Sequence, residues 1–404
     1  MGNRLLVARD EISGRVARYD YDEFDNLISA EYERGGEVER LYRVPDRMGN
    51  LFEMREKDDR KYDASGRLAE DREHFYHYDC EGNLVFKEFK EMAWGGGIIA
   101  PINKERLETE LGIRFRAFDT GWRYDWQSDG MLARVVRPDG KEVSFAYDAL
   151  GRRIRKSFAG TTTHFVWDGN VPLHEWAEEN VVTWLFEQDT FVPAAKLVAN
   201  GECFSIVSDY LGTPLQAFDN NGNKIWEQEL DIFGRKRRKG NNKSSFIPFK
   251  YQGQYEDVET GLYYNRFRYY EPNTGTYISQ DPIGLVGGNP TLYAFVSDPN
   301  IWEDVFGLDC GRSGKQAKLR SLLDDPNTPK HVKGWIKQEL NSIFRKKRRT
   351  IRNPKGYELA HKRGMEAAKG FGYEHSNLQL ASLHRLQHKY DNFGRLNKRV
   401  KIKL

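Results

Sequence analysis

The chain has 404 residues, with 63 Lys and Arg against 60 Asp and Glu, and a formal net charge of +3. No run of about 18 apolar residues occurs, which excludes a membrane-spanning segment. The three cysteines, Cys80, Cys203 and Cys310, are far apart and odd in number. This excludes a disulfide framework and a zinc site made only of cysteines.

The small net charge hides two oppositely charged parts. Residues 309–404 hold 24 Lys and Arg and 8 Asp and Glu, a net charge of +16. Residues 1–308 hold the remaining 39 and 52, a net charge of −13. Such asymmetry indicates a nucleic-acid or membrane partner for the basic part. Because five of the nine histidines also lie there, we expect a nucleic-acid-cleaving domain on an acidic carrier.

The acidic part repeats one short unit: an aromatic residue, an Asp, a turn with Gly or Asn, and a new strand. Each unit predicts a β-hairpin, because Asp opens the turn by bonding to the backbone and Gly supplies a positive φ. One hairpin cannot bury its own face, so we expect neighbouring hairpins to stack. The Asp residues are too regular to be catalytic. The units are Arg18–Leu27, Lys61–Leu68, Tyr78–Leu84, Tyr124–Leu132, Tyr147–Ile154, Trp167–Gly169 and Phe218–Ile225.

Four further segments make the pattern specific: Asp209–Pro214, Tyr251–Tyr255, Glu259–Tyr270 and Gly275–Leu285. With the repeats, they resemble the YD repeats and the repeat-associated core of the Rhs and toxin-complex proteins. The resemblance implies a mainly β, strand-wound shell over residues 1–308, followed by a small α+β or mostly α toxin domain. We expect repeats over 1–240, the core over 241–308 and the basic toxin over 309–404.

The resemblance also implies a self-cleavage site at the seam between the two parts. Asp281 and Asp304 match two aspartates that the family brings together, and the matching scissile bond is Leu308–Asp309. Two like charges in close approach cannot both ionise, so one Asp would stay protonated while the other acts as base toward water. The sequence departs from the pattern at Val305, where the family has Pro. The alternative is that both motifs are turns without proteolysis.

The basic part begins with a helix-forming segment. Apolar residues recur at helical spacing over residues 330–343. A run of cations then follows, which predicts a phosphate-binding patch. The alternative is a solvated face or a contact with an acidic wall. The predicted nucleic-acid contacts are Arg345, Lys346, Lys347, Arg348, Arg349 and Arg352, with Lys362 and Arg363 further along.

Histidines carry the predicted chemistry of this part. His384 and His388 are four residues apart in a helix-forming segment, so both imidazoles share one face and can hold one divalent metal. Together with His361 and Asn377 they stand in the order of an HNH or endonuclease VII-like ββα-metal nuclease. That resemblance implies His361 as general base, Asn377 as its brace, and a Mg or Zn ion on the helix histidines. Glu358 or His375 would supply a further ligand.

The tail also resembles the polymorphic toxin type 8 domain, through Arg352–Pro354, Leu359–Gly364, Ser376–Gln379 and Leu383–Tyr390. That family is predicted to be a nuclease. The usual acidic or histidine neighbour of the first His is replaced by Ala360. Either His361 works alone, or the domain is a metal-independent RNase. In the RNase, two histidines would act on the ribose 2′-OH, with Lys362 or Arg363 on the phosphate.

These features favour an Rhs toxin that releases a nuclease by aspartyl self-cleavage and acts in contact-dependent competition. We expect synthesis in the cytoplasm, export without a signal peptide, and action in the target-cell cytoplasm. The expected partners are nucleic acid, an immunity protein that is acidic where it meets the basic face, and a type VI secretion spike protein. The alternatives are a non-enzymatic YD-repeat surface or carbohydrate-binding protein, and an inactive orphan copy.

Overall fold

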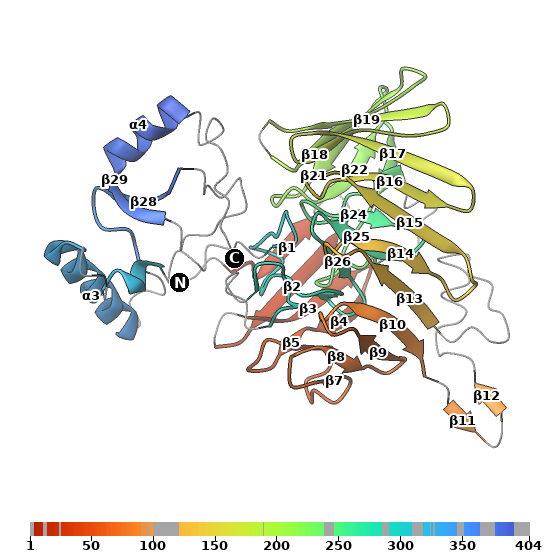
Figure 1. Cartoon of the computed structure of the whole chain (residues 1–404), viewed down its shortest axis with the longest axis horizontal. Helices are drawn as coiled ribbons and strands as arrows, with labels where there is room; N and C mark the ends of the chain where they lie inside the picture. Colours follow the sequence, from red (N-terminus) through yellow and green to blue (C-terminus); the bar gives the residue numbers. More distant parts are fainter. Residues whose placement is uncertain are drawn as a thin grey trace. The chain divides into compact units, whose positions relative to one another are not determined.

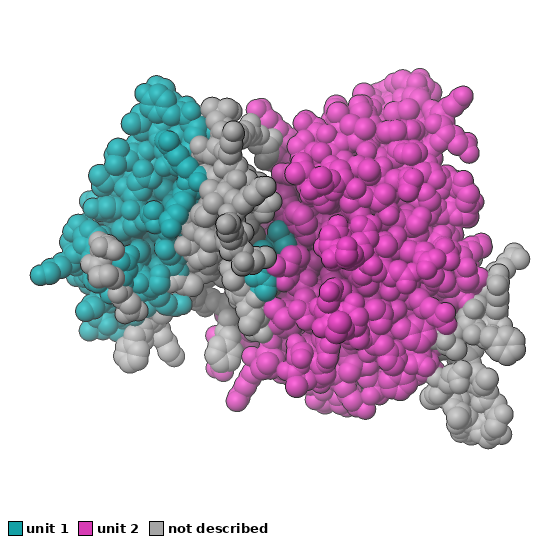
Figure 2. All heavy atoms as spheres, viewed as in Figure 1, with its two compact units in different colours: residues 1–3, 283–289, 308–404 teal, residues 4–282, 290–307 magenta. Residues whose placement is uncertain are grey.

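The fold is taken from a computed structural model of the whole chain (Figure 1). The structure describes residues 4–10, 14–23, 26–90, 92–94, 97–99, 121–188, 190–237, 246–284, 291–308, 318–323, 325, 328–345, 351–363 and 376–391. Two compact units divide the chain (Figure 2). Residues 4–282 and 290–307 belong to one, which we call the shell unit. Residues 308–404 belong to the other, which we call the C-terminal unit.

A large antiparallel sheet dominates the shell unit, with fifteen strands among the described residues (Figure 1). Its strands follow the chain, each pairing with the next, except that β10 pairs with β13. In sheet order the strands are β23 (Lys224–Glu227), β22 (Pro214–Phe218), β21 (Cys203–Ser208), β20 (Pro193–Val198), β19 (Asn180–Phe186), β18 (Val171–Ala177), β17 (Thr161–Asp168), β16 (Arg153–Phe158), β15 (Glu142–Tyr147), β14 (Leu132–Val136), β13 (Gly121–Trp126), β10 (Leu84–Phe89), β9 (His74–Tyr78), β8 (Leu68–Glu70) and β7 (Lys61–Tyr62).

Smaller antiparallel sheets complete the unit. The first has four strands, β1 (Val7–Asp10), β2 (Arg15–Tyr21), β3 (Leu27–Arg34) and β4 (Glu37–Tyr42). Another has β24 (Tyr255–Asp257), β25 (Leu262–Asn265), β26 (Arg268–Glu271) and β27 (Thr276–Tyr277). Two pairs remain, β5 (Val44–Pro45) with β6 (Leu51–Phe52), and β11 (Met92–Trp94) with β12 (Gly97–Ile99).

Local hydrogen bonds build the turns that connect the strands, as the turn at Asp148 illustrates. Oδ1 of Asp148 accepts from the backbone N–H groups of Leu150 and Arg152, both at 2.9 Å. Gly151 adopts a φ of 72°, which an L side chain rarely tolerates. The same pattern recurs at Asp63, Asp79, Asp209, Asp219 and Asp231. The interpretation of these Asp residues as turn formers is therefore confirmed.

Two of the predicted turns begin two residues later than expected. Asp20 lies inside β2 and Asp125 inside β13. The acid that bonds the first turn is Asp22, which accepts from Asn26 N at 2.9 Å. The second turn runs from Gln127 to Met131. In each case two more residue pairs join the ladder, because strand pairing continues where the partner strand has backbone groups to match.

The main core of the shell unit lies between the large sheet and the β24–β27 sheet. Trp122, Leu132 and Val135 of the large sheet share a buried cluster with Leu262 and Tyr269 of the smaller one. The hydroxyls of Tyr147 and Tyr269 also lie 2.8 Å apart. A buried ion pair joins the sheets, with Arg153 Nη1 2.5 Å from Asp257 Oδ2. These contacts hold the β24–β27 sheet, which carries part of the seam site, in a fixed place.

The described C-terminal unit is α+β. It contains α3 (Lys330–Phe344), β28 (Tyr357–His361), β29 (Ser376–Leu380) and α4 (Ala381–Asp391). Val332 and Ile336 of α3 are fully buried in a cluster with Leu359 of β28. The helix predicted over residues 330–343 is confirmed, and so is the fold class, a mainly β shell followed by a small α+β domain. No helix among the described residues is long and apolar enough to cross a membrane.

Candidate functional sites

The first site lies at the end of the shell unit, where Arg268 of β26 joins the two predicted aspartates. Its Nη2 atom is 3.0 Å from Asp281 Oδ2 and 3.3 Å from Asp304 Oδ2. Its Nε atom donates to the carbonyl oxygen of Gly307. All three charged side chains are buried, with Arg268 only 1% exposed. One guanidinium thus contacts both acids and the peptide that precedes Leu308.

Two polar side chains of the same sheet complete this cluster. Tyr277 of β27 donates its hydroxyl to Asp304 Oδ2 at 2.8 Å. Asn265 of β25 donates to the Tyr277 hydroxyl at 2.7 Å and to the Asp304 carbonyl at 2.8 Å. Burial, followed by the charge of Asp304, raises the pKa of Tyr277 well above its usual value. Tyr277 therefore stays a neutral donor throughout the physiological range.

The structure brings Asp281 and Asp304 together, as the seam motifs implied, and adds a cation to the pair. Both carboxylates contact Arg268, a positive charge that the sequence argument did not include. Arg268, Tyr277 and Asn265 lie in the segments Glu259–Tyr270 and Gly275–Leu285, whose sequence pattern by itself assigns them no role. Leu308 is buried, whereas Asp309 lies outside the described residues.

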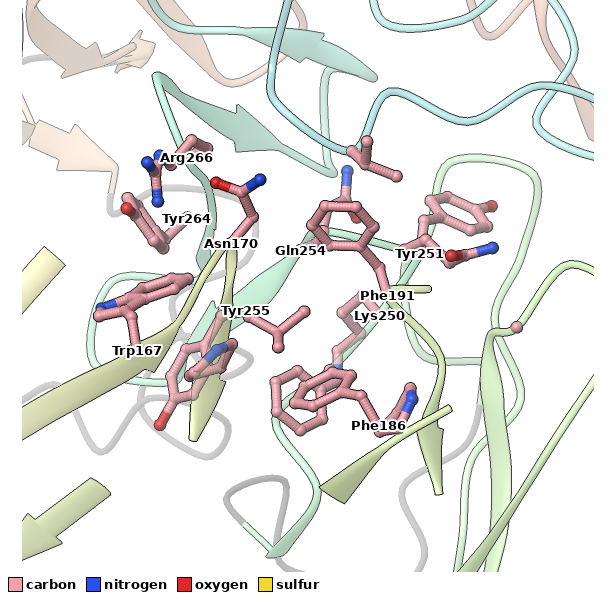
Figure 3. Close-up of a pocket in the computed structure, with 18 of the residues that line it drawn as sticks. Trp167, Asn170, Phe186, Phe191, Lys250, Tyr251, Gln254, Tyr255, Tyr264 and Arg266 are labelled. Carbon is pink, nitrogen blue, oxygen red and sulfur yellow. The ribbon is translucent and has the colours of Figure 1, made fainter. Parts of the chain in front are cut away.

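An apolar pocket lies beside the second motif of the seam (Figure 3). Its walls include Trp167, Phe186 and Tyr255. Val305 is part of its lining, and the neighbouring Phe306 meets Phe191 edge-on with ring centroids 5.4 Å apart. The aliphatic side chain of Val305 suits such walls. No predicted catalytic residue lines the pocket.

The second site is in the C-terminal unit, where β28, β29 and α4 follow one another in a ββα arrangement. The strands are antiparallel, with Glu358 opposite Gln379 and Ala360 opposite Asn377. Side chains alternate between the two faces of a strand. Glu358 and Asn377 therefore share one face of the two-stranded ribbon, and the side chain of His361 lies on the opposite face. The brace of His361 by Asn377 stays a prediction.

Helix α4 brings its two histidines toward Glu358. The Nδ1 atom of His384 lies 2.7 Å from Glu358 Oε2, and the rings of His384 and His388 have centroids 4.2 Å apart. Because a carboxylate accepts at Nδ1, the proton of a neutral His384 sits there and Nε2 carries the basic lone pair. Both imidazoles share one helical face, as the spacing predicted. Glu358 contacts His384 directly, which is the geometry of an orienting residue.

A complete metal site is not formed by the described residues. Within them, no group of three or more His, Cys, Asp or Glu side chains is placed to hold a cation. Glu358, predicted as a ligand, is engaged with His384. His375, the other predicted ligand, lies outside the described residues. The Mg or Zn ion stays a prediction, and no chemical step below passes through it.

The predicted phosphate contacts fall into three groups. Arg345, Lys362 and Arg363 are exposed to solvent. Arg352 is also exposed, and it makes a two-point ion pair with the buried Glu339 of α3, at 3.1 Å from Nε and 3.0 Å from Nη2. This pair ties α3 to the segment before β28, so part of the Arg352 charge is already met within the domain. Lys346, Lys347, Arg348 and Arg349 lie outside the described residues.

Comparison with known families agrees with both parts of the chain. A model described as the teneurin YD-shell matches residues 115–286, and a model described as bacterial toxin 8 matches residues 322–391. The chain belongs to the Rhs family of YD-repeat toxins. The toxin 8 match spans the whole of α3, β28, β29 and α4, so both Rhs modules predicted from the sequence are present.

Two curated relatives and one solved structure illustrate the similarity. The "Probable deoxyribonuclease RhsA" of Dickeya dadantii is 28% identical over 60% of this chain and 16% of its own length. The "Toxin protein Tse5" of Pseudomonas aeruginosa is 30% identical over 75% of this chain and 26% of its own. The crystal structure of TcdB2-TccC3 without its hypervariable C-terminal region matches with a TM-score of 0.40 and 18% identity, covering 73% and 18% of the two chains. The Rhs chain described here thus spans about a sixth to a quarter of these relatives.

Proposed function

We propose that the C-terminal unit cleaves phosphodiester bonds in nucleic acid. The observation that carries the proposal is the contact between Glu358 and His384 in a ββα arrangement. A histidine oriented by a carboxylate is suited to moving a proton in catalysis. The +16 charge of residues 309–404 supplies attraction for a polyanion. The toxin 8 match and a relative named as a probable deoxyribonuclease agree with this function.

Each residue of the candidate site in the C-terminal unit has a part in the proposed reaction. Nε2 of His384 takes the proton of the attacking oxygen as that oxygen bonds to phosphorus, and Glu358 steadies the imidazolium that forms. The bond from phosphorus to the leaving oxygen breaks, and that oxygen takes a proton from solvent water. The attacking oxygen belongs to water if the phosphodiester is hydrolysed, or to the ribose 2′-OH if the substrate is RNA. Lys362 and Arg363 bind the phosphate oxygens. If His384 and His388 instead hold a divalent ion, that ion would stabilise charge on the phosphate, and His361 would take the proton of the attacking oxygen.

Nucleic-acid integrity in bacteria that express the full chain tests this function. We expect wild type to degrade DNA or RNA and arrest growth, and His384→Ala to remove both effects. Separate DNA and RNA readouts identify the substrate. In the purified protein, EDTA stops a metal-dependent reaction and leaves a 2′-OH mechanism intact. Intact nucleic acid with wild type, on chains shown to be folded, would favour the binding-protein or inactive-copy alternatives.

We also propose that the chain cuts itself between Leu308 and Asp309. One aspartate of the Asp281 and Asp304 pair takes a proton from water while the water oxygen bonds to the Leu308 carbonyl carbon. The other, protonated, gives its proton to the Asp309 nitrogen as the C–N bond breaks. The products are a carboxylate at Leu308 and an amine at Asp309. Burial of both acids beside the Gly307 peptide supports this assignment.

Gel analysis of the expressed chain tests the cut. Wild type should give fragments of residues 1–308 and 309–404, and Asp281→Asn or Asp304→Asn should leave the 404-residue chain. Asp219→Asn is the matched control, because Asp219 forms an exposed turn in the same unit. An uncut wild type on chains with a folded shell unit would mean that the two motifs are only turns.

Delivery into competing bacteria follows as a proposal from the toxin relatives. A producing strain should outcompete a neighbour that lacks the cognate immunity gene, and deletion of the type VI spike gene should abolish the advantage. The immunity protein should be acidic where it meets the basic unit, since complementary charge speeds association. Equal competition with and without the immunity gene would contradict this role.

A further inference from the structure

The contacts of Arg268 point to a role that neither aspartate can fill. Its side chain is buried among the two carboxylates and the Tyr277 ring, whose centroid lies 3.6 Å from the guanidinium carbon. Nη2 reaches the carboxylates of Asp281 and Asp304, and Nε reaches the Gly307 carbonyl. A planar guanidinium presents its donors at fixed angles. One side chain therefore sets the positions of both acids relative to the chain that leads into the cut.

Charge gives Arg268 a second function. The proposed cut needs one protonated and one ionised carboxyl in the pair, a net charge of −1. With Arg268 the buried cluster is neutral in that state, and without it a single buried negative charge would be left uncompensated. Burying an unpaired charge is costly. Tyr277 also contacts Asp304, but it is a neutral donor, so it cannot replace the guanidinium.

We infer that Arg268 is the positioning residue of the self-cleavage site, holding the Gly307 peptide and balancing the charge of Asp281 and Asp304. The inference rests on the proposed self-cleavage and adds the residue that organises it. It assigns Arg268 no bond to make or break. The proton and the C–N bond are handled by the two aspartates and water, as described above.

Two substitutions separate the two functions of Arg268. Arg268→Lys keeps the charge but loses the second donor that reaches Gly307, so we expect the normal pH range of cutting and a rate lower by about 10- to 100-fold. Arg268→Met loses both the positive charge and the donor to Gly307. We expect it to cut more slowly still and over a pH range moved upward by about one to three units, because the acids then hold protons more tightly.

The rate can be followed by synthesising the full chain in a cell-free system, which avoids toxicity. Translation is stopped, the sample is moved to a series of pH values, and the fragments are measured over time on gels. Limited proteolysis of each variant shows whether the shell unit is folded. Lys196→Met is the control, since Lys196 is also a buried cation of the shell unit, 7% exposed, and donates to the Phe246 carbonyl at 2.8 Å rather than to a seam residue. It should cut like wild type.

The outcomes distinguish this inference from the proposed function. If wild type stays uncut, self-cleavage itself is wrong. If wild type cuts and Arg268→Lys cuts at the same rate, the proposal that Arg268 holds the Gly307 peptide for cutting is wrong. If folded Arg268→Met keeps the wild-type pH range, the charge function is wrong. Slow cutting by both variants, with the pH range moved only in Arg268→Met, supports the inference. Arg268→Lys alone decides the positioning function if Arg268→Met does not fold.

Discussion

His384 Nδ1 lies 2.7 Å from Glu358 Oε2, so a strand residue and a helix residue that are 26 positions apart form one hydrogen-bonded pair. The pair fixes which nitrogen of His384 carries the proton and leaves Nε2 as the basic atom. Glu358 therefore acts through His384. The role of Glu358 as a direct metal ligand stays a prediction beside this one.

The pair predicts a graded loss of nuclease activity. Glu358→Gln keeps the size of the side chain but weakens its hold on the imidazole, so we expect activity to fall by about 10- to 100-fold. His384→Ala should reduce it to background. His331→Ala is the control, because His331 is an exposed histidine of the same unit and lies on α3. Equal activity for Glu358→Gln and wild type, in assays of purified full-length chains, would contradict the orienting role.

Gly253 should be needed for self-cleavage because the seam backbone passes against it. A Cβ atom at Gly253 would lie 2.3 Å from the Val305 carbonyl oxygen and 2.6 Å from its Cα. Such contacts force the backbone beside Asp304 to move, and displacement of reacting groups by about 1 Å can cost about 100-fold in rate. We therefore expect Gly253→Ala to slow cutting at least 10-fold in the cell-free assay.

The control for this variant is Gly222→Ala. Gly222 has a φ of 81° against 83° for Gly253, and nothing lies within 4 Å of its Cβ position. Both changes therefore carry the same backbone strain, and only one carries the clash. Equal rates for the two variants would show that close packing of Val305 on Gly253 does not position the seam.

Asp148 should contribute to stability through its turn and not to catalysis. Asp148→Ala removes the acceptor of the Leu150 and Arg152 N–H groups, so we expect a loss of about 1–2 kcal/mol in the free energy of unfolding. Urea denaturation of chains that carry His384→Ala measures it. Nuclease activity at 25 °C, measured with active His384, should not change. A large loss of activity in a folded Asp148→Ala chain would reopen a catalytic role for the repeat aspartates.

The stability due to Asp148 should disappear in acid. Burial acts to raise the pKa of Asp148, but hydrogen bonds from Arg152 and Leu150 outweigh it and lower the pKa. A lowered carboxyl pKa adds stability above the unfolded value of about 4, and this is lost as the pH falls through the folded value. The gap between wild type and Asp148→Ala should thus narrow below about pH 4. A difference in the free energy of unfolding that widens below pH 4 would contradict a lowered pKa for Asp148.

Lys250 should give a pH dependence of the same sign, but at the alkaline end. It is fully buried, 2.8 Å from Glu256 Oε2, and burial lowers its pKa to about 8 although Glu256 acts to raise it. Between about pH 8 and the usual 10.5, the unfolded chain binds a proton that the folded chain does not. Stability therefore rises with pH in this window, by up to about 3 kcal/mol.

Comparison with Lys250→Met isolates this effect, because the tyrosines titrate equally in both chains. Urea denaturation from pH 8 to 10.5, in chains carrying His384→Ala, should show wild type gaining stability relative to the variant. A constant difference over this range would mean that Lys250 stays protonated in the folded chain.

Much of the fold could be predicted from the sequence because its turns are local. Asp148 bonds to residues two and four positions ahead, and Gly151 takes its positive φ within the same turn. The helices α3 and α4 and the shared face of His384 and His388 also follow from spacing within one helix. The exact starts of the turns at Asp22 and Gln127 could not be predicted, since strand pairing decides where a ladder stops.

The sequence by itself determined the hairpin repeats, the charge division near residue 308 and the identity of the two seam aspartates. Only the tertiary structure placed Arg268 between Asp281 and Asp304, which are 13 and 36 residues away from it, and turned Glu358 toward His384. The physical reason is the separation along the chain between the residues that make each contact. Turn and helix contacts join near neighbours in the chain, whereas these pairs depend on strand register and on how separate elements pack.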